Sequence, residues 1–116
     1  TLFRSLISHP KCVIGAYEDT YVRLFDSHKM VDSFKAHNEP VMGVSLHSNQ
    51  PNSLFSCSQD GYVRLWDLRR LDKQVWETVG HQKKNDEAVH FIQTNFDGVT
   101  VSGGADSVLK LYAPIN

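Results

Sequence analysis

An eight-residue motif that occurs three times is the feature of this sequence that most restricts its fold. The motif reads DTYVRLFD at 19–26, DGYVRLWD at 60–67 and DSVLKLYA at 106–113. Its aromatic seventh residue recurs after 41 and then 46 residues. Because a motif that returns after about 40 residues is typical of a repeated structural unit, we expect the chain to consist of three similar units.

Each copy of the motif has the residue pattern of the second strand of a hairpin. Apolar residues alternate with a basic residue in Val-Arg-Leu, Val-Arg-Leu and Leu-Lys-Leu, which is the period of two expected for a β-strand. A short apolar run precedes each copy, and these runs read CVIGAY, SLFSCS and VTVSGG. The Asp-Thr, Asp-Gly or Asp-Ser pair that opens the motif supplies turn residues. Each run and the motif after it are therefore predicted to form a β-hairpin.

Further short apolar runs flank these hairpins. VMGVSLH at 41–47 and AVHFIQT at 88–94 precede two of them, and MVDSF at 30–34 and QVWETV at 74–79 follow two of them. Four short antiparallel strands per repeat, without a helical pattern, are typical of one blade of a β-propeller. We predict an all-β chain of about three four-stranded blades, the last without its outer strand. The expected blades span about 1–36, 37–80 and 81–116.

Histidine and serine residues recur in register with the motif. His37 and His81 precede the aspartate of their motif by 23 and 25 residues, and Ser56 and Ser102 precede it by four. In these features the chain resembles the WD-repeat family, whose blades carry a hydrogen-bonded His–Ser/Thr–Asp–Trp tetrad. The resemblance implies one tetrad of His37, Ser56, Asp60 and Trp66, and a second of His81, Ser102, Asp106 and Tyr112, with tyrosine in place of tryptophan. The first repeat departs from the pattern, because Gly15 replaces the serine and Phe25 the tryptophan.

Three blades are too few to close a propeller, which needs roughly four to eight. The resemblance implies that these repeats are the last three blades of a seven-bladed ring, with the missing outer strand supplied by the N-terminal segment of the ring. A blade has two apolar faces, so the isolated chain is expected to expose one of them at each end and to self-associate.

Several stretches resemble the striatin family more specifically. They are HQKKNDEAVH at 81–90, SGGADSVLKLY at 102–112 and SHPKCVIGAYEDTYVRLFD at 8–26. The resemblance implies a non-catalytic, cytoplasmic protein–protein interaction scaffold that brings a type 2A protein phosphatase together with Ste20-like kinases. Alternatives are a WD-repeat substrate receptor, a chromatin-associated adaptor that reads a basic peptide, a propeller enzyme, and a structural subunit of another large assembly such as a trafficking coat.

The binding residues are expected on the loops that hold the tetrad histidines and the aspartate turns. Exposed tyrosines and mixed charges are typical of protein interfaces, although a solvated loop is the alternative for each residue. The His81–Glu87 connection is the strongest candidate, because extra length within a repeat often has a function. The candidates are Tyr17, Glu18, Tyr21, Asn38, Glu39, Gln59, Tyr62, Lys83, Lys84, Asp86 and Glu87.

Composition and spacing argue against other classes of function. A net charge of −1 with 22% charged residues gives no general attraction to nucleic acid or to an anionic membrane, and no apolar run is long enough to span a bilayer. The six histidines lack ligand spacing, so no metal or other cofactor is predicted. The tetrad residues resemble a Ser-His-Asp triad, but they recur in each repeat without a G-x-S-x-G elbow, so we interpret them as structural.

Two further sets of residues are expected to have structural roles. Cys12 and Cys57 lie in apolar runs and are predicted to be buried free thiols in a reducing compartment. Arg23, Arg64 and Lys110 hold equivalent places in the motif, and we expect their aliphatic stems to pack between blades while the charged ends project to solvent.

Overall fold

The computed structural model describes residues 3–27, 29–47, 50–79, 81, 89–94, 100–104 and 109–112, and in these residues it contains strands and turns but no helix. The strands form three antiparallel sheets. Sheet 1 consists of β1 (Phe3–Ser8), β2 (Val13–Tyr17), β3 (Tyr21–Asp26) and β4 (Lys29–Lys35). Sheet 2 consists of β5 (Val41–His47), β6 (Gln50–Ser58), β7 (Tyr62–Asp67) and β8 (Trp76–Val79). Sheet 3 consists of β9 (Val89–Thr94), β10 (Thr100–Gly104) and β11 (Leu109–Tyr112).

The predicted all-β fold is confirmed, and the three copies of the motif form β3, β7 and β11. In β7, Val63 and Leu65 are buried and Arg64 between them is half-buried, as the pleat of a strand requires. β1 is the strand that the sequence patterns do not predict. The pairing of β1 with β2 shifts between Phe3 and Ser5, and this irregularity breaks the alternation that would otherwise mark the strand.

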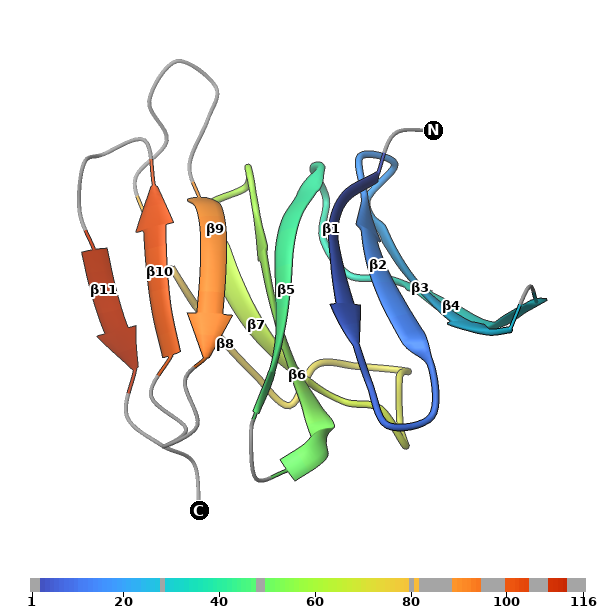
Figure 1. Ribbon diagram of the computed structural model, residues 1–116. Coiled ribbons are helices and arrows are strands. Elements are labelled where there is room, and N and C mark those ends of the chain that lie inside the picture. The colour runs from blue at the N-terminus through green and yellow to red at the C-terminus, as the bar shows by residue number, and fades with distance from the viewer. Residues whose placement is uncertain are drawn as a thin grey trace.

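The three sheets stand side by side, with their first strands β1, β5 and β9 next to one another (Figure 1). Sheet 2 occupies the middle position. Its strand β5 contacts β1 and β2 of sheet 1, while β9 of sheet 3 contacts β5 and β6. This order is the one expected for neighbouring propeller blades.

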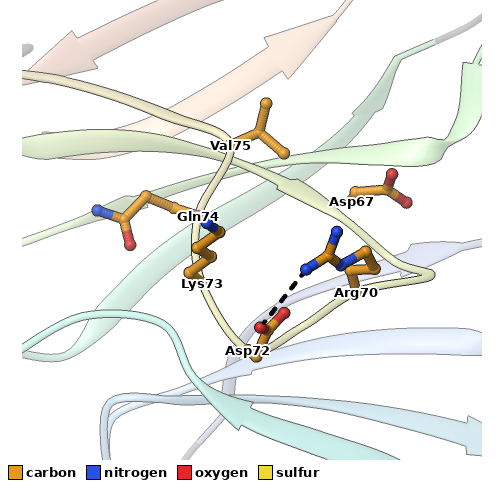
Figure 2. Close-up of a pocket in the computed structure, with 6 residues that line it drawn as sticks. All are labelled: Asp67, Arg70, Asp72, Lys73, Gln74 and Val75. Carbon is orange, nitrogen blue, oxygen red and sulfur yellow. Dashed lines mark ion pairs between the residues drawn. The ribbon is translucent and has the colours of Figure 1, made fainter.

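The connection between β7 and β8 borders an open pocket of about 360 Å³ (Figure 2). Its basic residues pair locally: Arg69 bonds to Asp67 at 2.9 Å, and Nη2 of Arg70 lies 3.9 Å from Oδ2 of Asp72. Both arginines are mostly exposed, and exposed ion pairs of this kind contribute little to stability. This surface therefore has the character of a solvated connection rather than of a phosphate-binding site. The residues that line the pocket are Asp67, Arg70, Asp72, Lys73, Gln74 and Val75.

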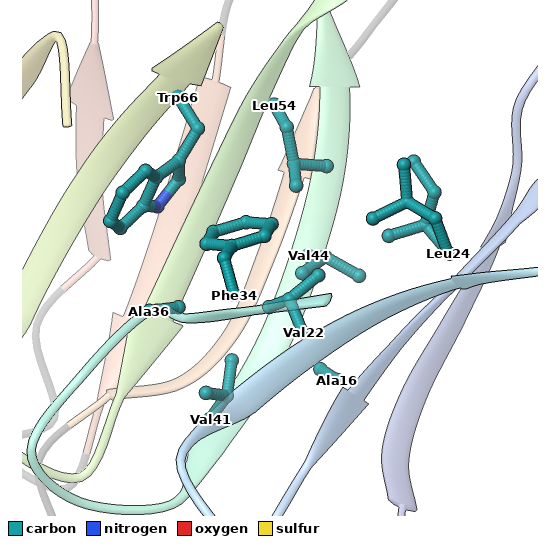
Figure 3. Packing of buried hydrophobic residues seen from close by; sticks show 10 residues of the cluster. Ala16, Val22, Leu24, Phe34, Ala36, Val41, Val44, Leu54 and Trp66 are labelled. Atoms are coloured by element: carbon teal, nitrogen blue, oxygen red, sulfur yellow. The ribbon is translucent and has the colours of Figure 1, made fainter. Parts of the chain in front are cut away.

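An apolar core fills the space between sheets 1 and 2 (Figure 3). Phe34 of β4 packs against Trp66 of β7, with ring centroids 4.7 Å apart at an angle of 56°. Full burial of a large apolar side chain contributes about 1.5–3 kcal/mol, so this layer holds the two sheets together. Its buried members are Ile14, Ala16, Val22, Leu24, Phe34, Ala36, Val41, Val44, Leu54 and Trp66.

A second core lies between sheets 2 and 3. Phe55 and Cys57 of β6 and Val63 and Leu65 of β7 pack with Ile92 of β9. Alternate residues of β6 and β7 thus enter different cores, which explains why the run SLFSCS lacks a polar face. Hydrogen bonds reinforce this interface, because Oγ of Ser45 donates to Oγ1 of Thr94 at 2.7 Å.

The two cysteines differ in their surroundings. Cys57 is fully buried, as predicted, and burial raises the pKa of its thiol far above the usual value. The prediction is wrong for Cys12, which lies before β2 and is only partly buried, because a hairpin turn places it at the rim of the core. Among the residues that the structure describes, no helix has the length and apolarity needed to cross a membrane.

Candidate interaction surface

Four side chains of the second repeat form a continuous chain of hydrogen bonds. Nδ1 of His37, which lies between β4 and β5, is 3.0 Å from Oδ2 of Asp60 in the β6–β7 turn. Nε2 of His37 is 2.8 Å from Oγ of Ser56 in β6. Nε1 of Trp66 in β7 donates to the same oxygen at 2.9 Å. These hydrogen bonds tie the segment entering sheet 2 to the central hairpin of that sheet.

The donors and acceptors of these four side chains have one arrangement that satisfies every group. The indole N–H can only donate, so Oγ of Ser56 accepts from Trp66. The Ser56 hydroxyl then donates to Nε2 of His37, and the Nδ1–H of His37 donates to the Asp60 carboxylate. In this arrangement His37 is neutral, and each side chain fixes the orientation of the next.

The pKa values of the two titratable members agree with this arrangement. Burial lowers the pKa of His37 below its usual value, and the hydrogen bond to Asp60 opposes this effect only in part. Burial acts to raise the pKa of Asp60, but the hydrogen bonds donated by His37, Tyr62 N–H and Asn38 N–H outweigh it and lower the pKa. A neutral histidine and an ionised aspartate are therefore the stable pair.

The third repeat repeats part of this arrangement. Nε2 of His81 lies 2.8 Å from Oγ of Ser102, which lies 2.9 Å from the hydroxyl of Tyr112. A phenol can both donate and accept, so it does not fix the direction of the bonds as an indole does. Burial raises the pKa of the Tyr112 phenol. Asp106, the remaining residue of this predicted tetrad, lies outside the described residues.

The first repeat replaces the tetrad with an ion pair. Nη1 and Nη2 of Arg23 donate to the two carboxylate oxygens of Asp19 at 3.0 and 2.6 Å, and this interaction lowers the pKa of Asp19. The ring of Tyr17 covers Gly15, because a Cβ atom at Gly15 would lie 3.1 Å from Cε1 of Tyr17. The guanidinium of Arg23 in turn lies 4.6 Å from the Tyr17 ring centroid. Tyr17 and Arg23 thus occupy the space that the missing serine leaves.

Backbone hydrogen bonds bind each hairpin turn to the segment that enters the next sheet. The N–H groups of Ala36 and His37 donate to the carbonyl of Thr20 at 3.0 and 3.4 Å, and the N–H of His81 donates to the carbonyl of Gly61 at 3.2 Å. The carbonyl groups belong to equivalent residues, both with positive φ: 80° at Thr20 and 87° at Gly61. These turns and segments lie along one edge of the stack, which we call the turn edge (residues 17–21, 36–40, 59–62 and 81).

The structure places seven of the candidate binding residues on the turn edge. Asn38 is exposed and Tyr21 is 37% exposed, while the other five are half-buried. The charged end of Glu18 is paired with Arg4 of β1. The seven residues are Tyr17, Glu18, Tyr21, Asn38, Glu39, Gln59 and Tyr62. The other four candidates, Lys83, Lys84, Asp86 and Glu87, lie outside the described residues.

The tyrosines of the turn edge lie beside arginines of the adjoining strands β3 and β7. Arg23 lies between Tyr17 and Tyr21, at 4.6 and 5.4 Å from their ring centroids. Arg64 lies 5.3 Å from the Tyr62 ring centroid. Stacked arginine and tyrosine side chains are held in place before binding, and both residue types are enriched at interface hot spots.

The expectation that the motif arginines project their charge to solvent is wrong for Arg64. Its Nη1 donates to the carbonyl of Ala36 at 2.7 Å and its Nε to Glu77 at 3.2 Å. Its side chain is 16% exposed, because the segment entering sheet 2 supplies an acceptor that a single strand does not reveal. Sequence reasoning also missed Thr20, whose role depends on the conformation of a turn rather than on a residue type typical of binding.

The Ser56 hydroxyl, which a serine-based catalytic site would need to expose, is buried within the tetrad. Ser56 is 0% exposed and its oxygen is engaged by Trp66 and His37, so no substrate can reach it. In the part of the chain that the structure describes, no group of three or more His, Cys, Asp or Glu residues is placed to hold a metal ion. The edge offers aromatic, charged and amide groups for contact with another surface.

Comparison with known proteins supports the repeat assignment. Residues 28–67 match the family described as WD40: WD domain, G-beta repeat. Human striatin is 32% identical over 114 residues, covering 92% of this chain and 14% of striatin, and human striatin-3 gives the same identity and coverage. The striatin homolog of Dictyostelium discoideum is 30% identical over 113 residues, covering 91% of this chain and 13% of that protein. The chain thus spans only a small part of the length of these relatives.

The family match and the structure agree. The matched segment contains most of sheet 2, and sheets 1 and 3 repeat its strand order. The striatin alignments extend over nearly the whole chain. The chain therefore contains a WD repeat and is similar to striatin over nearly all of its 116 residues.

Proposed function

We propose that this chain is a non-enzymatic protein–protein interaction module, and that its partners are components of type 2A protein phosphatase and Ste20-like kinase complexes in the cytoplasm. The similarity to striatin and the WD repeats support a scaffold of this kind. The chain covers 14% of striatin, so the proposal concerns one adaptor surface and not the activities of a whole scaffold.

The observation that carries the proposal is the construction of the turn edge. Tyr21 and Tyr62 begin equivalent strands, and each lies beside a stacked arginine. The turn before Tyr62 is fixed by partly buried hydrogen bonds that Asp60 accepts from His37 and from the backbone N–H of Tyr62. A surface ordered in advance loses little conformational entropy on binding, which favours recognition of a folded protein.

The proposal is tested with purified proteins. The chain is immobilised, and binding of a type 2A phosphatase core and of a Ste20-like kinase is measured by biolayer interferometry. The double variant Tyr21→Ala/Tyr62→Ala is expected to bind at least tenfold more weakly, a loss of about 1.4 kcal/mol, because tyrosine is enriched among the few residues that dominate an interface. Circular dichroism checks that this variant keeps the sheet structure.

Arg69→Ala is the matched control, since Arg69 is 71% exposed and lies in the connection after β7, away from the turn edge. It is expected to bind like the wild-type chain. The proposal fails if neither probe binds, or if Arg69→Ala weakens binding as much as the double variant does. Binding of ubiquitin-ligase or histone-modifying components in place of the two probes would favour the receptor or chromatin adaptor.

A further inference from the structure

The guanidinium of Arg64 joins the segment entering sheet 2, strand β8 and the ring of Tyr62. Its Nη1 donates to the carbonyl of Ala36 at 2.7 Å, and its Nε donates to the carboxylate of Glu77 at 3.2 Å. Its Cζ lies 5.3 Å from the Tyr62 ring centroid. The Arg64 side chain is 16% exposed, and a charge this far from water needs bonded partners. Two acceptors in different segments therefore fix the plane of the guanidinium beside the ring.

The carbonyl that holds Arg64 is itself held in place. The N–H groups of Ala36 and His37 on either side of it donate to the carbonyl of Thr20 at 3.0 and 3.4 Å. Ala36 is 0% exposed and belongs to the core between sheets 1 and 2. A carbonyl in a buried and bonded segment cannot move to follow a side chain, so the position of the guanidinium is set by the backbone rather than the reverse.

The backbone of Tyr62 is fixed separately from its ring. The N–H of Tyr62 donates to Oδ1 of Asp60 at 2.9 Å, which sets the point where the side chain leaves the strand. This bond does not restrict the rotations of the side chain about χ1 and χ2. The ring is half-buried, and within the described part of the chain its polar neighbour is Arg64. The contact with Arg64 is thus the interaction suited to orient the ring.

Tyrosine and arginine vary together among the three copies of the motif. The first two copies read Tyr-Val-Arg at their third to fifth residues, whereas the third copy reads Val-Leu-Lys at 108–110. The lysine of the third copy, Lys110, is exposed. Lysine carries the charge of arginine but not the planar fork that can bond a carbonyl and a carboxylate while it lies against a ring. The arginine therefore accompanies the tyrosine and is not a requirement of the strand alone.

We propose that Arg64 is a positioning residue of the turn edge, which orients the ring of Tyr62 for the partner and does not contact the partner itself. This inference rests on the proposed function, because it concerns the same binding surface. A side chain that is ordered only on binding weakens the affinity about two- to tenfold, and a ring oriented beforehand avoids this loss. The low exposure of Arg64 agrees with an indirect role, since it leaves little of the side chain for a partner to touch.

The first test observes the Tyr62 ring without a partner, by NMR of the chain labelled with ring-¹³C tyrosine. Arg64→Lys keeps the charge but loses the fork, so the Tyr62 ring resonances are expected to shift and their relaxation to show faster motion, while the other three tyrosines are unaffected. Arg70→Lys, the same change at a side chain that is 73% exposed, is the matched control and should leave all four rings unchanged. An unchanged Tyr62 ring in Arg64→Lys would overturn the proposal.

A second variant covers the case in which Arg64→Lys loses its sheet structure, which the amide spectrum reports. Glu77→Ala removes one of the two acceptors of Arg64 at a side chain that is 37% exposed. It is expected to shift the Tyr62 ring in the same direction and by less, because the bond to the Ala36 carbonyl remains. A Tyr62 ring that responds to neither variant would contradict a positioning role.

The second test is a double-mutant cycle in binding to the phosphatase core and the kinase named above. Arg64→Lys alone is expected to weaken binding about two- to tenfold, and Arg70→Lys to leave it unchanged. In a Tyr62→Ala background, Arg64→Lys should have no further effect, because the ring that it positions is gone. An equal loss in both backgrounds would show that Arg64 contacts the partner directly and would overturn the proposal. If neither probe binds the wild-type chain, the proposed function fails, and the ring measurement still decides whether Arg64 positions Tyr62.

Discussion

At the scale of single residues, the Ser56 hydroxyl connects three elements. Its oxygen accepts a hydrogen bond from Trp66 in β7, and its O–H donates a hydrogen bond to His37, which precedes β5. Ser56 itself lies in β6. Each partner is buried, so loss of the hydroxyl would leave two polar groups without water to replace it. This connection keeps the Nε2 atom of His37 unprotonated.

The neutral state of His37 makes folding stability depend on pH. The pKa of His37 is lowered by folding, so the unfolded chain binds more protons as the pH falls below the unfolded value of 6.5. The stabilisation is complete above that value and is lost as the pH falls toward the pKa of the folded state. Asp60 adds an effect of the same sign below its ordinary value of 3.8.

We therefore expect the free energy of unfolding, measured with urea, to be lower at pH 5.5 than at pH 7.5. His37→Asn lacks the titrating group and is expected to show a smaller difference between the two pH values. The exposed replacement Ser8→Ala is expected to keep the wild-type difference. Equal pH dependence in the wild-type chain and in His37→Asn would contradict this account.

The sequence predicts some members of this network and not others. His37, Ser56 and Asp60 have counterparts at similar spacing in the third unit, so these residues could be chosen from the sequence. The pairing of Asp19 with Arg23 could not be predicted from the sequence, because it depends on which acceptor lies nearest to a flexible guanidinium. The bond from Arg64 to the Ala36 carbonyl joins residues 28 positions apart and was hidden for the same reason.

At the scale of elements, the hairpin turns repeat a backbone conformation with different residues. Thr20 and Gly61 both have positive φ and both bind the segment entering the next sheet. Glycine adopts this conformation readily, whereas a β-branched residue such as threonine is strained there. The first turn thus has the less suitable residue for the same geometry.

Exchange of these two residues should have opposite effects on stability. Thr20→Gly is expected to raise the free energy of unfolding by up to about 1 kcal/mol, because relief of strain exceeds the entropy that glycine adds to the unfolded chain. Gly61→Thr is expected to lower it by about 1–3 kcal/mol. Thermal unfolding followed by circular dichroism measures both, and changes of the same sign would refute the equivalence of the turns.

The strands themselves were largely predictable. Alternation in the motif marks β3, β7 and β11, and the turn residues before it mark the hairpins. β1 was not predictable, because its register shift breaks the alternating pattern near Phe3. Local sequence reports alternation within a strand, but it does not report which strands of different repeats touch.

At the scale of the whole molecule, an aromatic residue of one sheet contacts the aromatic seventh residue of the motif in the next sheet. Phe34 of sheet 1 packs on Trp66 of sheet 2 at 4.7 Å, and Trp76 of sheet 2 lies 6.1 Å from Tyr112 of sheet 3. Phe34 and Trp76 are not at equivalent positions in their strands, so no repeat pattern in the sequence indicates this contact. The inter-sheet interface therefore depends on individual large side chains.

Phe34→Ala is expected to lower the free energy of unfolding by about 3–5 kcal/mol, because it opens a cavity beside the indole of Trp66. In a Trp76→Phe background Trp66 is the only tryptophan, so its fluorescence should shift to longer wavelength as water reaches the cavity. Met30→Ala, at an exposed residue of the same strand, is expected to change stability by less than about 0.5 kcal/mol. An unchanged spectrum and a small loss of stability for Phe34→Ala would contradict this view of the interface.

Sheet 2 has covering sheets on both sides, and this position sets the order in which the molecule comes apart. In stacked repeats each unit depends mainly on its immediate neighbours, so fraying begins at the ends and moves inward. Amide protons of β6 would exchange with solvent only when the whole stack opens, while those of the end sheets exchange through partial openings of lower free energy. Of the three described sheets, the middle one is thus the last to open.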